Sequence, residues 1–583
     1  MYFFHLFRSF LPLRSPLGFG ISDFLELAIA ILLVALLVCR PWLQSFAARF
    51  AHRTLPCMLL LALLPVALRL ALLRQSPVPT PSGADAFSYL LLGDTLAHFR
   101  LANPPHPLSQ FFEAIFTLQQ PSYISIFPLG QGIALALGTL LFGIPWAGVV
   151  LSVSALCALS YWMLRAWVAP TWALLGGILC VIEFGPLSQW MNSYWGGAVS
   201  AIAGCLVFGS LPRLRTHRRI RHALLLGFGL GIQLLTRPFE FVLLLGSVVL
   251  FLLPLSKKDR WISQFPGRIL PFLLLPLLLA ASLTLLQNKA VTGHWNTLPY
   301  MLSRYQYGVP TTFTFQPNPI PHRPLTPEQD LDYRAQSIIH GDQADTLQSY
   351  VQRLLYRARY YRFFFLPPLY LALFAFLFTL RSRRASWIVF TLLLFALGTN
   401  IYPYFYPHYI AALTSLFLLI SVSGLQKISE VTLHGSRIGS SVAYLLGILC
   451  IAPFLFWWSL HVAGPQDLSP AFDYETWNYL NYGDPEGRIA INRQLSRAPG
   501  KQLVFVHYSP RHRFREWIHN AANIDASRVV WAHDLGPIEN QKLLRYYPHR
   551  TAWLLQPDTD PPQLSPYTAA PTSTTTPFQS LNP

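Results

Sequence analysis

"RLRTHRRIRH", residues 213–222, places five arginines in one short connection between two strongly apolar stretches. Basic residues of membrane proteins gather in the short cytoplasmic loops beside spanning helices. We therefore expect this connection to lie in the cytoplasm and the flanking stretches to cross a membrane. Its position orients the rest of the chain.

The composition is that of a membrane protein. Hydrophobic residues form 53% of the 583 residues and charged residues only 12%, which is more apolar surface than a soluble fold buries. The net charge of +18 falls in short clusters between apolar runs, and no nucleic-acid motif accompanies it, so we expect no nucleic-acid partner. The cysteines lie in or beside apolar runs and indicate neither a disulfide framework nor a zinc site.

Three further basic clusters should share the cytoplasmic side: residues 40–53, "KKDR" at 257–260 and "RSRR" at 381–384. The apolar runs between these anchors predict spanning helices, each needing about 20 residues. We place them at 22–39, 56–73, 222–238, 239–255, 267–287, 363–380, 386–402, 408–424 and 440–460.

Residues 124–212 contain four more apolar runs, although a path from an outer loop to the cytoplasmic arginines needs an odd number of crossings. We expect 124–143, which contains Pro128 and several glycines, to be re-entrant or interfacial. The total is then about 12 spans. Residues 1–21 carry Arg8, Arg14 and two prolines, which indicates an interfacial segment rather than a cleavable signal.

This topology places three parts outside: the loops 74–126 and 288–362, and everything after 461. Residues 461–555 predict a small α/β domain, with strands in "QLVFVHYS", "SRVVWAHDLG" and "RTAWLLQPD" and a helix in "ENQKLLRYYP". It has no Gly-rich phosphate loop. Residues 556–583 are rich in Pro and Thr and are predicted to be disordered. The fold class is thus an α-helical polytopic membrane protein with a C-terminal extracytoplasmic α/β domain.

The first outer loop contains "GADAFSYLLLGDTLAHFRLANPPHP", residues 83–107. Asp85 follows a turn signal and begins a predicted short helix along the membrane surface. A carboxylate there either caps free N–H groups of the helix or acts chemically, and the spacing leaves both roles open. Asp94 is expected on a solvated face.

Several motifs together resemble a known family. An Asp at the start of the first outer loop, "NPPHP", "QQPSYISIFPLGQG", "NSYWGGA" and "TRPFE" are similar to the GT-C membrane glycosyltransferases. Within these, the chain is most similar to the group of family 39 mannosyltransferases, aminoarabinose transferases and RgtA/B/C/D-like transferases. The resemblance covers roughly residues 80–425 and fits a bacterial inner (plasma) membrane protein.

The resemblance implies transfer of a sugar from a polyprenyl-phosphate carrier to a lipid, glycan or protein acceptor on the extracytoplasmic face. Asp85 matches the family's loop Asp, a general base or metal-linked residue. An acceptor hydroxyl must lose a proton as it attacks the anomeric carbon, and a carboxylate can accept it. One displacement would invert that carbon. A divalent cation is left open, and no other cofactor is indicated.

A departing lipid phosphate needs positive charge or oriented donors. Arg237, at the outer end of a span, is our first candidate for the residue that binds the donor phosphate. The alternative is that Arg237 forms a structural ion pair with Glu240. His408, in "YFYPHYIAAL", belongs either to a cavity or to an aromatic belt at the membrane surface. Arg304 and Tyr305 lie in the long loop 288–362, which is of a length typical of lids and binding loops, and we expect them at a donor-phosphate or cavity position.

Polar and aromatic residues on the predicted outer side are candidates for acceptor or sugar contacts, although membrane anchoring also explains the aromatic ones. They are Asp94, His106, Tyr123, Asn192, Tyr194 and Trp195.

The chain departs from its relatives at three positions. Ala86 stands where relatives often carry a second acidic residue, and Ile126 and Leu129 replace a basic residue and a proline in "SIFPLG". These departures leave metal binding open and admit a catalytically degenerate assembly subunit. A transporter or flippase of lipid-linked saccharides is the other alternative. Placement of Asp85 in the middle of the membrane, far from Arg237, would favour the transporter or flippase.

Overall fold

The computed structural model of the protein describes residues 28–36, 41–81, 83–217, 219–253, 269–309, 313–340, 345–432, 438–464, 475–477, 487–510, 512 and 516–568. The predicted interfacial segment 1–21 and residues 569–583 of the predicted disordered tail lie outside these ranges.

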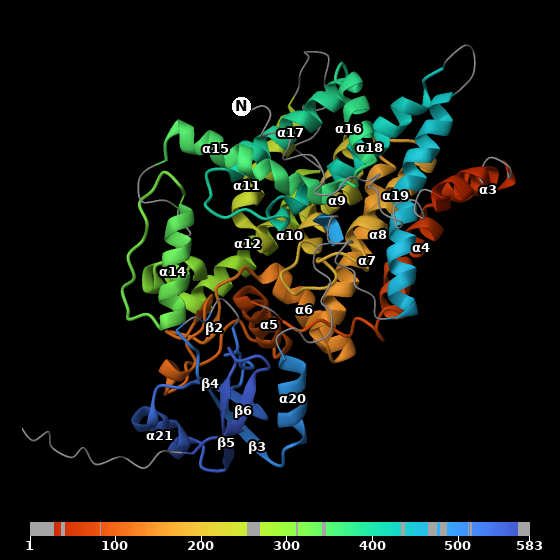
Figure 1. Cartoon of the computed structure of the whole chain (residues 1–583). Helices are drawn as coiled ribbons and strands as arrows, with labels where there is room; N and C mark the ends of the chain where they lie inside the picture. The colour runs from red at the N-terminus through yellow and green to blue at the C-terminus, as the bar shows by residue number, and fades with distance from the viewer. Residues whose placement is uncertain are drawn as a thin grey trace, which may run out of the picture.

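The chain up to Ala463 forms a bundle of helices, and a small sheet projects from one end of it (Figure 1). The bundle contains α3 (Pro41–Ala51), α4 (Thr54–Ala71), α6 (Leu129–Phe142), α7 (Pro145–Leu164), α8 (Pro170–Phe184), α9 (Ala198–His217), α10 (Ile220–Thr236), α11 (Pro238–Leu252), α12 (Leu270–Thr292), α16 (Leu369–Phe376), α17 (Arg383–Thr399), α18 (Thr414–Ser429) and α19 (Ile438–Ala463).

Helices occupy the spans predicted from the sequence. Six described helices are long and apolar enough to cross a membrane, a pair bent by 114° around residue 366 adds a seventh if it is one span, and α6, α8, α10 and α11 are shorter apolar helices. Residues 28–36 are helical within the predicted span 22–39, whose remaining residues lie outside the described ranges. The re-entrant assignment of 124–143 and the total of about 12 spans stay predictions.

Glycines allow the buried helices of the bundle to approach closely. A Cβ at Gly204 on α9 would overlap the carbonyl oxygen of Ala412, and one at Gly424 on α18 would overlap that of Ala372. Small residues of this kind are typical of contacts between helices in membranes, where packing rather than the hydrophobic effect holds helices together.

The two outer loops are folded rather than irregular. The first carries α5 (Gly83–Ala97), the short segment η1 (Ser109–Phe111) and a hairpin of β1 (Thr117–Leu118) and β2 (Ile124–Ser125). The second carries α13 (Pro299–Tyr307), α14 (Pro327–His340), α15 (Leu347–Arg357) and η3 (Ala358–Phe364). A further segment, η5 (Pro407–Leu413), leads into α18.

The C-terminal domain is the small α/β unit that the sequence predicts. Strands β3 (Lys501–Val506), β4 (Val529–His533) and β5 (Arg550–Gln556) are parallel, and β6 (Gln563–Pro566) runs antiparallel to β5, in the order β4-β3-β5-β6. Helices α20 (Arg488–Arg497) and α21 (Pro537–Tyr546) accompany them. The prediction of disorder from residue 556 is wrong for β6. An edge strand tolerates proline, so a Pro-rich composition conceals it.

The sheet domain docks on the first outer loop. Leu91 of α5 and Phe111 share one apolar cluster with Leu503 and Phe505 of β3. On its other side α5 packs against α6, where Leu92 contacts Leu129 within a second cluster. The apolar residues of α5 thus point to two sides and bury it between the bundle and the sheet domain, and its position along the membrane surface stays a prediction.

We expect Gly204→Ala to lower the stability of the bundle by about 1–3 kcal/mol or to prevent folding, because the added methyl group must displace backbone. Gly447→Ala on α19 is the control, since its nearest neighbour is a side-chain atom of Leu175 at 3.8 Å. Thermal unfolding of the purified protein in detergent measures both. Equal midpoints for the two variants would contradict the close contact between α9 and residue 412.

Candidate active-site cavity

A cavity of about 490 Å³ lies where the bundle, both outer loops and the sheet domain meet. Its walls come from the start of α5, the α10–α11 junction, α14, the tyrosine-rich segment before α18 and the sheet domain. Five of the residues predicted from the sequence line it: Asp85, Trp195, Arg237, Glu240 and His408.

Arg237 is placed by a break between two helices. It ends α10 with non-helical dihedrals (φ −146°, ψ 83°), and Pro238 begins α11. The guanidinium carbon lies 4.2 Å from the ring centroid of Tyr409, which also lines the cavity. Among the described residues, no ion pair within 4.0 Å joins Arg237 to Glu240. The arginine therefore faces the cavity rather than a carboxylate partner.

Asp85 lies in the first turn of α5, which begins at Gly83 with φ +71°. Burial raises the pKa of Asp85 to about 6, and the positive charge of Arg237 opposes this rise. Tyr89, one turn along the helix, lines the same cavity. Asp85 and Arg237 are thus close enough for their charges to interact, and Asp85 is not isolated within a span.

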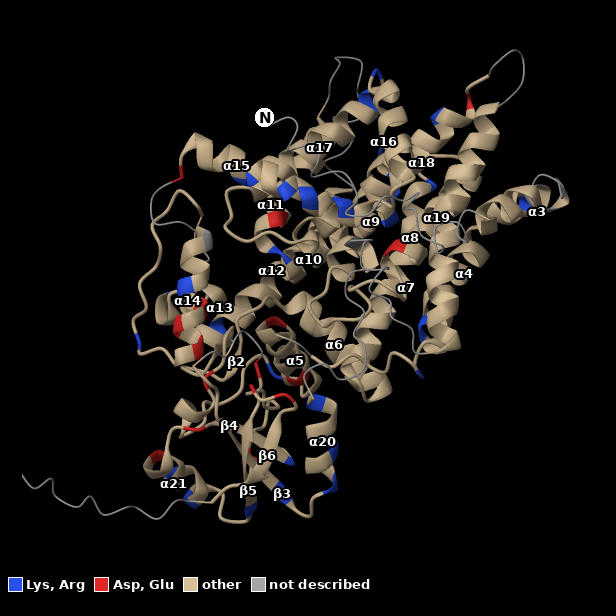
Figure 2. Ribbon diagram, viewed as in Figure 1, with Lys and Arg blue, Asp and Glu red and all other residues tan. Residues whose placement is uncertain are grey.

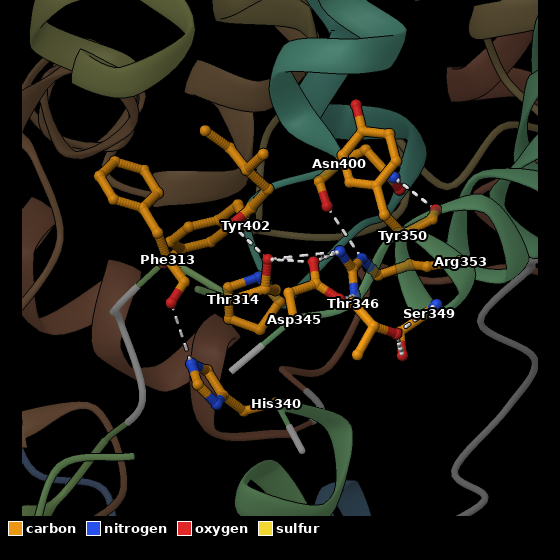
Figure 3. A network of polar contacts seen from close by, with 12 residues as sticks. Phe313, Thr314, His340, Asp345, Thr346, Ser349, Tyr350, Arg353, Asn400 and Tyr402 are labelled. Carbon is orange, nitrogen blue, oxygen red and sulfur yellow. Dashed lines mark hydrogen bonds and ion pairs between the residues drawn. The ribbon is translucent and has the colours of Figure 1, made fainter. Parts of the chain in front are cut away.

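A wall of tyrosines is held by arginines of the second outer loop. Arg353 donates to the carbonyl of Asn400 (2.8 Å) and pairs with Asp345. Arg357 donates to the carbonyls of Thr399, Tyr402 and Pro403 at 2.9, 2.7 and 2.7 Å. Figure 3 shows the contacts of Arg353 in this network, with Thr314 bridging Asp345 and the chain near Tyr402. Helix α15 therefore fixes the segment that presents Tyr402 and Tyr404 to the cavity.

His408 lies among aromatic rings at the start of η5. Its ring centroid is 4.9 Å from that of Tyr409, 5.9 Å from Tyr406 and 5.9 Å from Trp195. All four rings line the cavity. This arrangement gives a sugar ring flat faces on which to stack.

Helix α14 supplies acidic residues that the sequence reasoning missed. Glu328, Asp332 and Gln336 are spaced four apart, so they share one face of the helix, and all three line the cavity. Gln336 contacts Asp332 and accepts a hydrogen bond from Tyr404. Burial, and to a smaller extent the charge of Asp85, raise the pKa of Asp332 to about 7, and the hydrogen bond from Gln336 opposes this rise. The sequence signal that could have identified this face was the i, i+4, i+8 spacing of Glu328, Asp332 and Gln336 in the second outer loop.

Asp332 therefore gives Asp85 the acidic neighbour that position 86 lacks. Ala86 is buried in the apolar core of the bundle and does not line the cavity. Ile126 does line it, and Leu129 lies in the cluster beneath α5.

The sheet domain contributes His512 and Glu516, which were also missed. Asp558 holds His512 at 2.7 Å, and the Tyr508 hydroxyl donates to Glu516 at 2.9 Å. Burial raises the pKa of Glu516 to about 7. Both residues lie in a loop far along the chain, and nothing local in the sequence marks them.

Three predicted acceptor contacts of the first outer loop bind the sheet domain instead. Asp94 accepts from the backbone N–H of Ala522 (2.6 Å), and the Tyr123 hydroxyl donates to the carbonyl of Asn520 (3.0 Å). His106 lies 3.1 Å from the Tyr547 hydroxyl. Each of these three side chains has a hydrogen-bond partner in the sheet domain, so together they hold the first outer loop against that domain. None of the three lines the cavity.

Two more predicted contacts have structural partners. Asn192 accepts from Arg69 at 2.9 Å, and the Tyr194 hydroxyl donates to the carbonyl of Pro79 at 2.9 Å. Neither lines the cavity.

Arg304 and Tyr305 of α13 also lie outside the cavity lining, although Tyr300 of the same helix is part of it. Tyr305 is exposed and stacks on His322 with ring centroids 4.0 Å apart. Tyr305, five residues after Tyr300, points to another side of the helix, whereas Arg304 is four residues on, shares the face of Tyr300 and lies just outside the lining.

The described residues contain no group of three or more His, Cys, Asp and Glu side chains arranged to hold a metal ion. The donor set of the cavity thus does not fit the divalent cation that the sequence left open, and no chemical step below uses a metal.

No family model matches the chain, and no curated protein matches it. Among solved structures, the chain is similar to ArnT from Cupriavidus metallidurans in the apo state (12% identity, 84% of this chain and 92% of that one, TM-score 0.46). The undecaprenyl phosphate complex of ArnT gives 12% identity, coverage of 85% and 92%, and a TM-score of 0.47.

The chain is also similar to an oligosaccharyltransferase from Archaeoglobus fulgidus in the apo form, with 14% identity, coverage of 76% and 58%, and a TM-score of 0.41.

We expect Asp85→Asn to lower the pKa of Asp332 below about 7, because the substitution removes a negative charge that opposes its ionisation. The pH dependence of carbodiimide labelling, followed at Asp332 by mass spectrometry, measures this shift. Glu539→Gln, a surface substitution next to Lys542, should leave the labelling unchanged. An unchanged labelling midpoint in Asp85→Asn would show that the two carboxyl groups do not interact.

Proposed function

We propose that the protein is an integral membrane glycosyltransferase that moves a sugar from a polyprenyl-phosphate carrier to an acceptor hydroxyl on the extracytoplasmic face. The observation that carries this proposal is that Asp85 and Arg237 line one cavity, with aromatic rings beside them. A base and a phosphate-binding cation on one cavity are the two groups that such a transfer needs.

Asp85 is suited to act as the base. With a pKa of about 6 it is mostly ionised at neutral pH, yet it holds a proton better than an ordinary Asp. The acceptor oxygen loses its proton to Asp85 as it forms a bond to the anomeric carbon. The bond from that carbon to the carrier phosphate breaks, and the phosphate oxygen keeps the electron pair. One such displacement inverts the anomeric carbon.

Arg237 is suited to hold the carrier phosphate. A guanidinium binds phosphate oxygens through two parallel N–H donors, and it stabilises the negative charge that develops as the phosphate departs. Tyr409 under the guanidinium restricts its orientation. Trp195 and Tyr406 offer faces for the sugar or for the first carrier units.

The location of the carboxyl groups supports a transferase over a transporter. Transporters usually keep their ionisable groups near the middle of the membrane. Here Asp85, Asp332 and Glu516 come from the two outer loops and the sheet domain. With the arginine cluster at 213–222 in the cytoplasm, these parts lie outside, as expected in a bacterial inner membrane.

We expect Asp85→Asn to reduce transfer of radiolabelled sugar from an undecaprenyl-phosphate donor to membrane acceptors by about 10²–10⁴-fold, because the amide cannot accept the proton. Asp330→Asn, at an exposed carboxylate paired with Arg334, is the matched control. Thermal unfolding and retained binding of undecaprenyl phosphate check that the variant is folded. Full activity in Asp85→Asn would remove Asp85 from the mechanism, and movement of lipid-linked sugar between leaflets without transfer would support the transporter alternative.

The pH dependence of the transfer reaction should also reveal the ionisation of Asp85. Below about pH 6, kcat/KM should fall about tenfold per pH unit, because protonated Asp85 cannot accept a proton. Transfer rates measured between pH 4.5 and 8 (about the range in which carboxyl and imidazole groups titrate) test this. A rate that stays constant down to the lower limit would contradict a base with a raised pKa.

A further inference from the structure

The charges that line the cavity are unequally distributed. Arg237, at the ends of two bundle helices, is the one Lys or Arg among the described lining residues. On the side of α14 and the sheet domain the lining carries Glu328, Asp332 and Glu516, which we call the acidic wall. Figure 2 shows acidic residues gathered where α5, α14 and the sheet domain meet.

The acidic wall makes no close ion pair with a Lys or Arg of the described residues, although the charge of Arg488 favours the ionised form of Glu516 from a greater distance. Among the described residues, none of its carboxylates lies within 4.0 Å of a Lys or Arg nitrogen. The nearest basic group to Glu328 is His533, at 3.9 Å. Glu328 Oε2 is buried without a hydrogen-bond partner among the described residues. The wall therefore keeps free hydrogen-bonding capacity toward the cavity.

The acidic wall is also fixed in position. Tyr508 holds Glu516, and Gln336 holds Asp332. The first turn of α14 is anchored through Gln329, which donates to Glu113 at 3.2 Å. The first two bonds restrain the carboxyl groups of Glu516 and Asp332 within their own elements, and the third ties the start of α14 to the first outer loop.

We propose that the acidic wall forms the acceptor subsite and selects an uncharged, hydroxyl-bearing acceptor, excluding acceptors that carry a phosphate or carboxylate near the reacting hydroxyl. This inference rests on the proposed function. Carboxyl groups form hydrogen bonds with sugar hydroxyls, whereas a second anion in a poorly solvated acidic cavity is repelled. The donor phosphate already occupies Arg237, so no Lys or Arg of the described lining is left for an anionic acceptor.

The chemistry of the base agrees with this assignment. A phosphate oxygen is already ionised at neutral pH and needs no base, whereas a hydroxyl acceptor does. The electrostatics also agree, since burial raises the pKa of both Asp332 and Glu516 to about 7. The cavity thus resists additional negative charge even from its own residues.

Binding measured without transfer tests the proposal. The full chain, in a detergent without sugar and saturated with undecaprenyl phosphate, is titrated with methyl glucoside and with methyl glucoside 6-phosphate by saturation-transfer NMR. We expect the phosphorylated probe to bind at least about tenfold more weakly, the factor expected from about 1.4 kcal/mol of repulsion.

The ratio of the two affinities, measured above about pH 7 where both carboxyl groups are ionised, should shrink in Glu516→Gln and in Asp332→Asn, because each then removes one negative charge from the wall. Asp330→Asn lies on the same helix, pairs with Arg334 at 2.7 Å and is 40% exposed, so it should leave the ratio unchanged. Equal or tighter binding of the phosphorylated probe, no binding of the uncharged probe, or an equal change of the ratio in Asp330→Asn would each overturn the acceptor assignment. These outcomes are independent of the Asp85→Asn transfer assay, which tests the proposed function itself.

Discussion

The attraction between Asp85 and Arg237 across one cavity is the interaction on which the rest of the structure depends. A buried carboxylate is costly unless a positive charge or hydrogen bonds stabilise it, and burial already raises the pKa of Asp85 to about 6. The positive charge of Arg237, which packs against Tyr409, limits that rise. The pair is therefore held near each other without the direct ion pair that would consume both charges.

Much of the surrounding fold serves to hold these two groups. The α10–α11 break at Pro238 sets Arg237 at a helix end. The sheet domain fixes α5: Arg488 lies 4.5 Å from the ring of Phe87 and 4.3 Å from that of Trp517, and Phe87 contacts His519. A domain attached far along the chain thus locates the helix that carries Asp85, and it also contributes Glu516 to the cavity.

The sequence was informative where function follows from local pattern. Apolar runs and basic loops located the helices. Arg237 stood out because a charged residue is costly at a membrane edge, and Asp85 because it matches the loop Asp of the family that the sequence resembles. Asp94 and Tyr123 make hydrogen bonds to the sheet domain, and in the sequence a polar group at such an interface looks the same as one that binds a ligand. Glu516 reaches the cavity only through the long-range packing of the sheet domain, which no local pattern encodes. The acidic face of α14 that carries Asp332 was visible as a local spacing, but its position at the cavity was not.

The central claim is that Arg237 holds the carrier phosphate while Asp85 faces the anomeric carbon. A cryo-electron microscopy structure of the Asp85→Asn variant with an undecaprenyl-phosphate sugar tests it most directly, since this variant should retain the unreacted donor. We predict phosphate density within hydrogen-bond distance of the Arg237 guanidinium and the sugar between it and residue 85. Donor density bound elsewhere, with the cavity free of phosphate and sugar, would contradict the account.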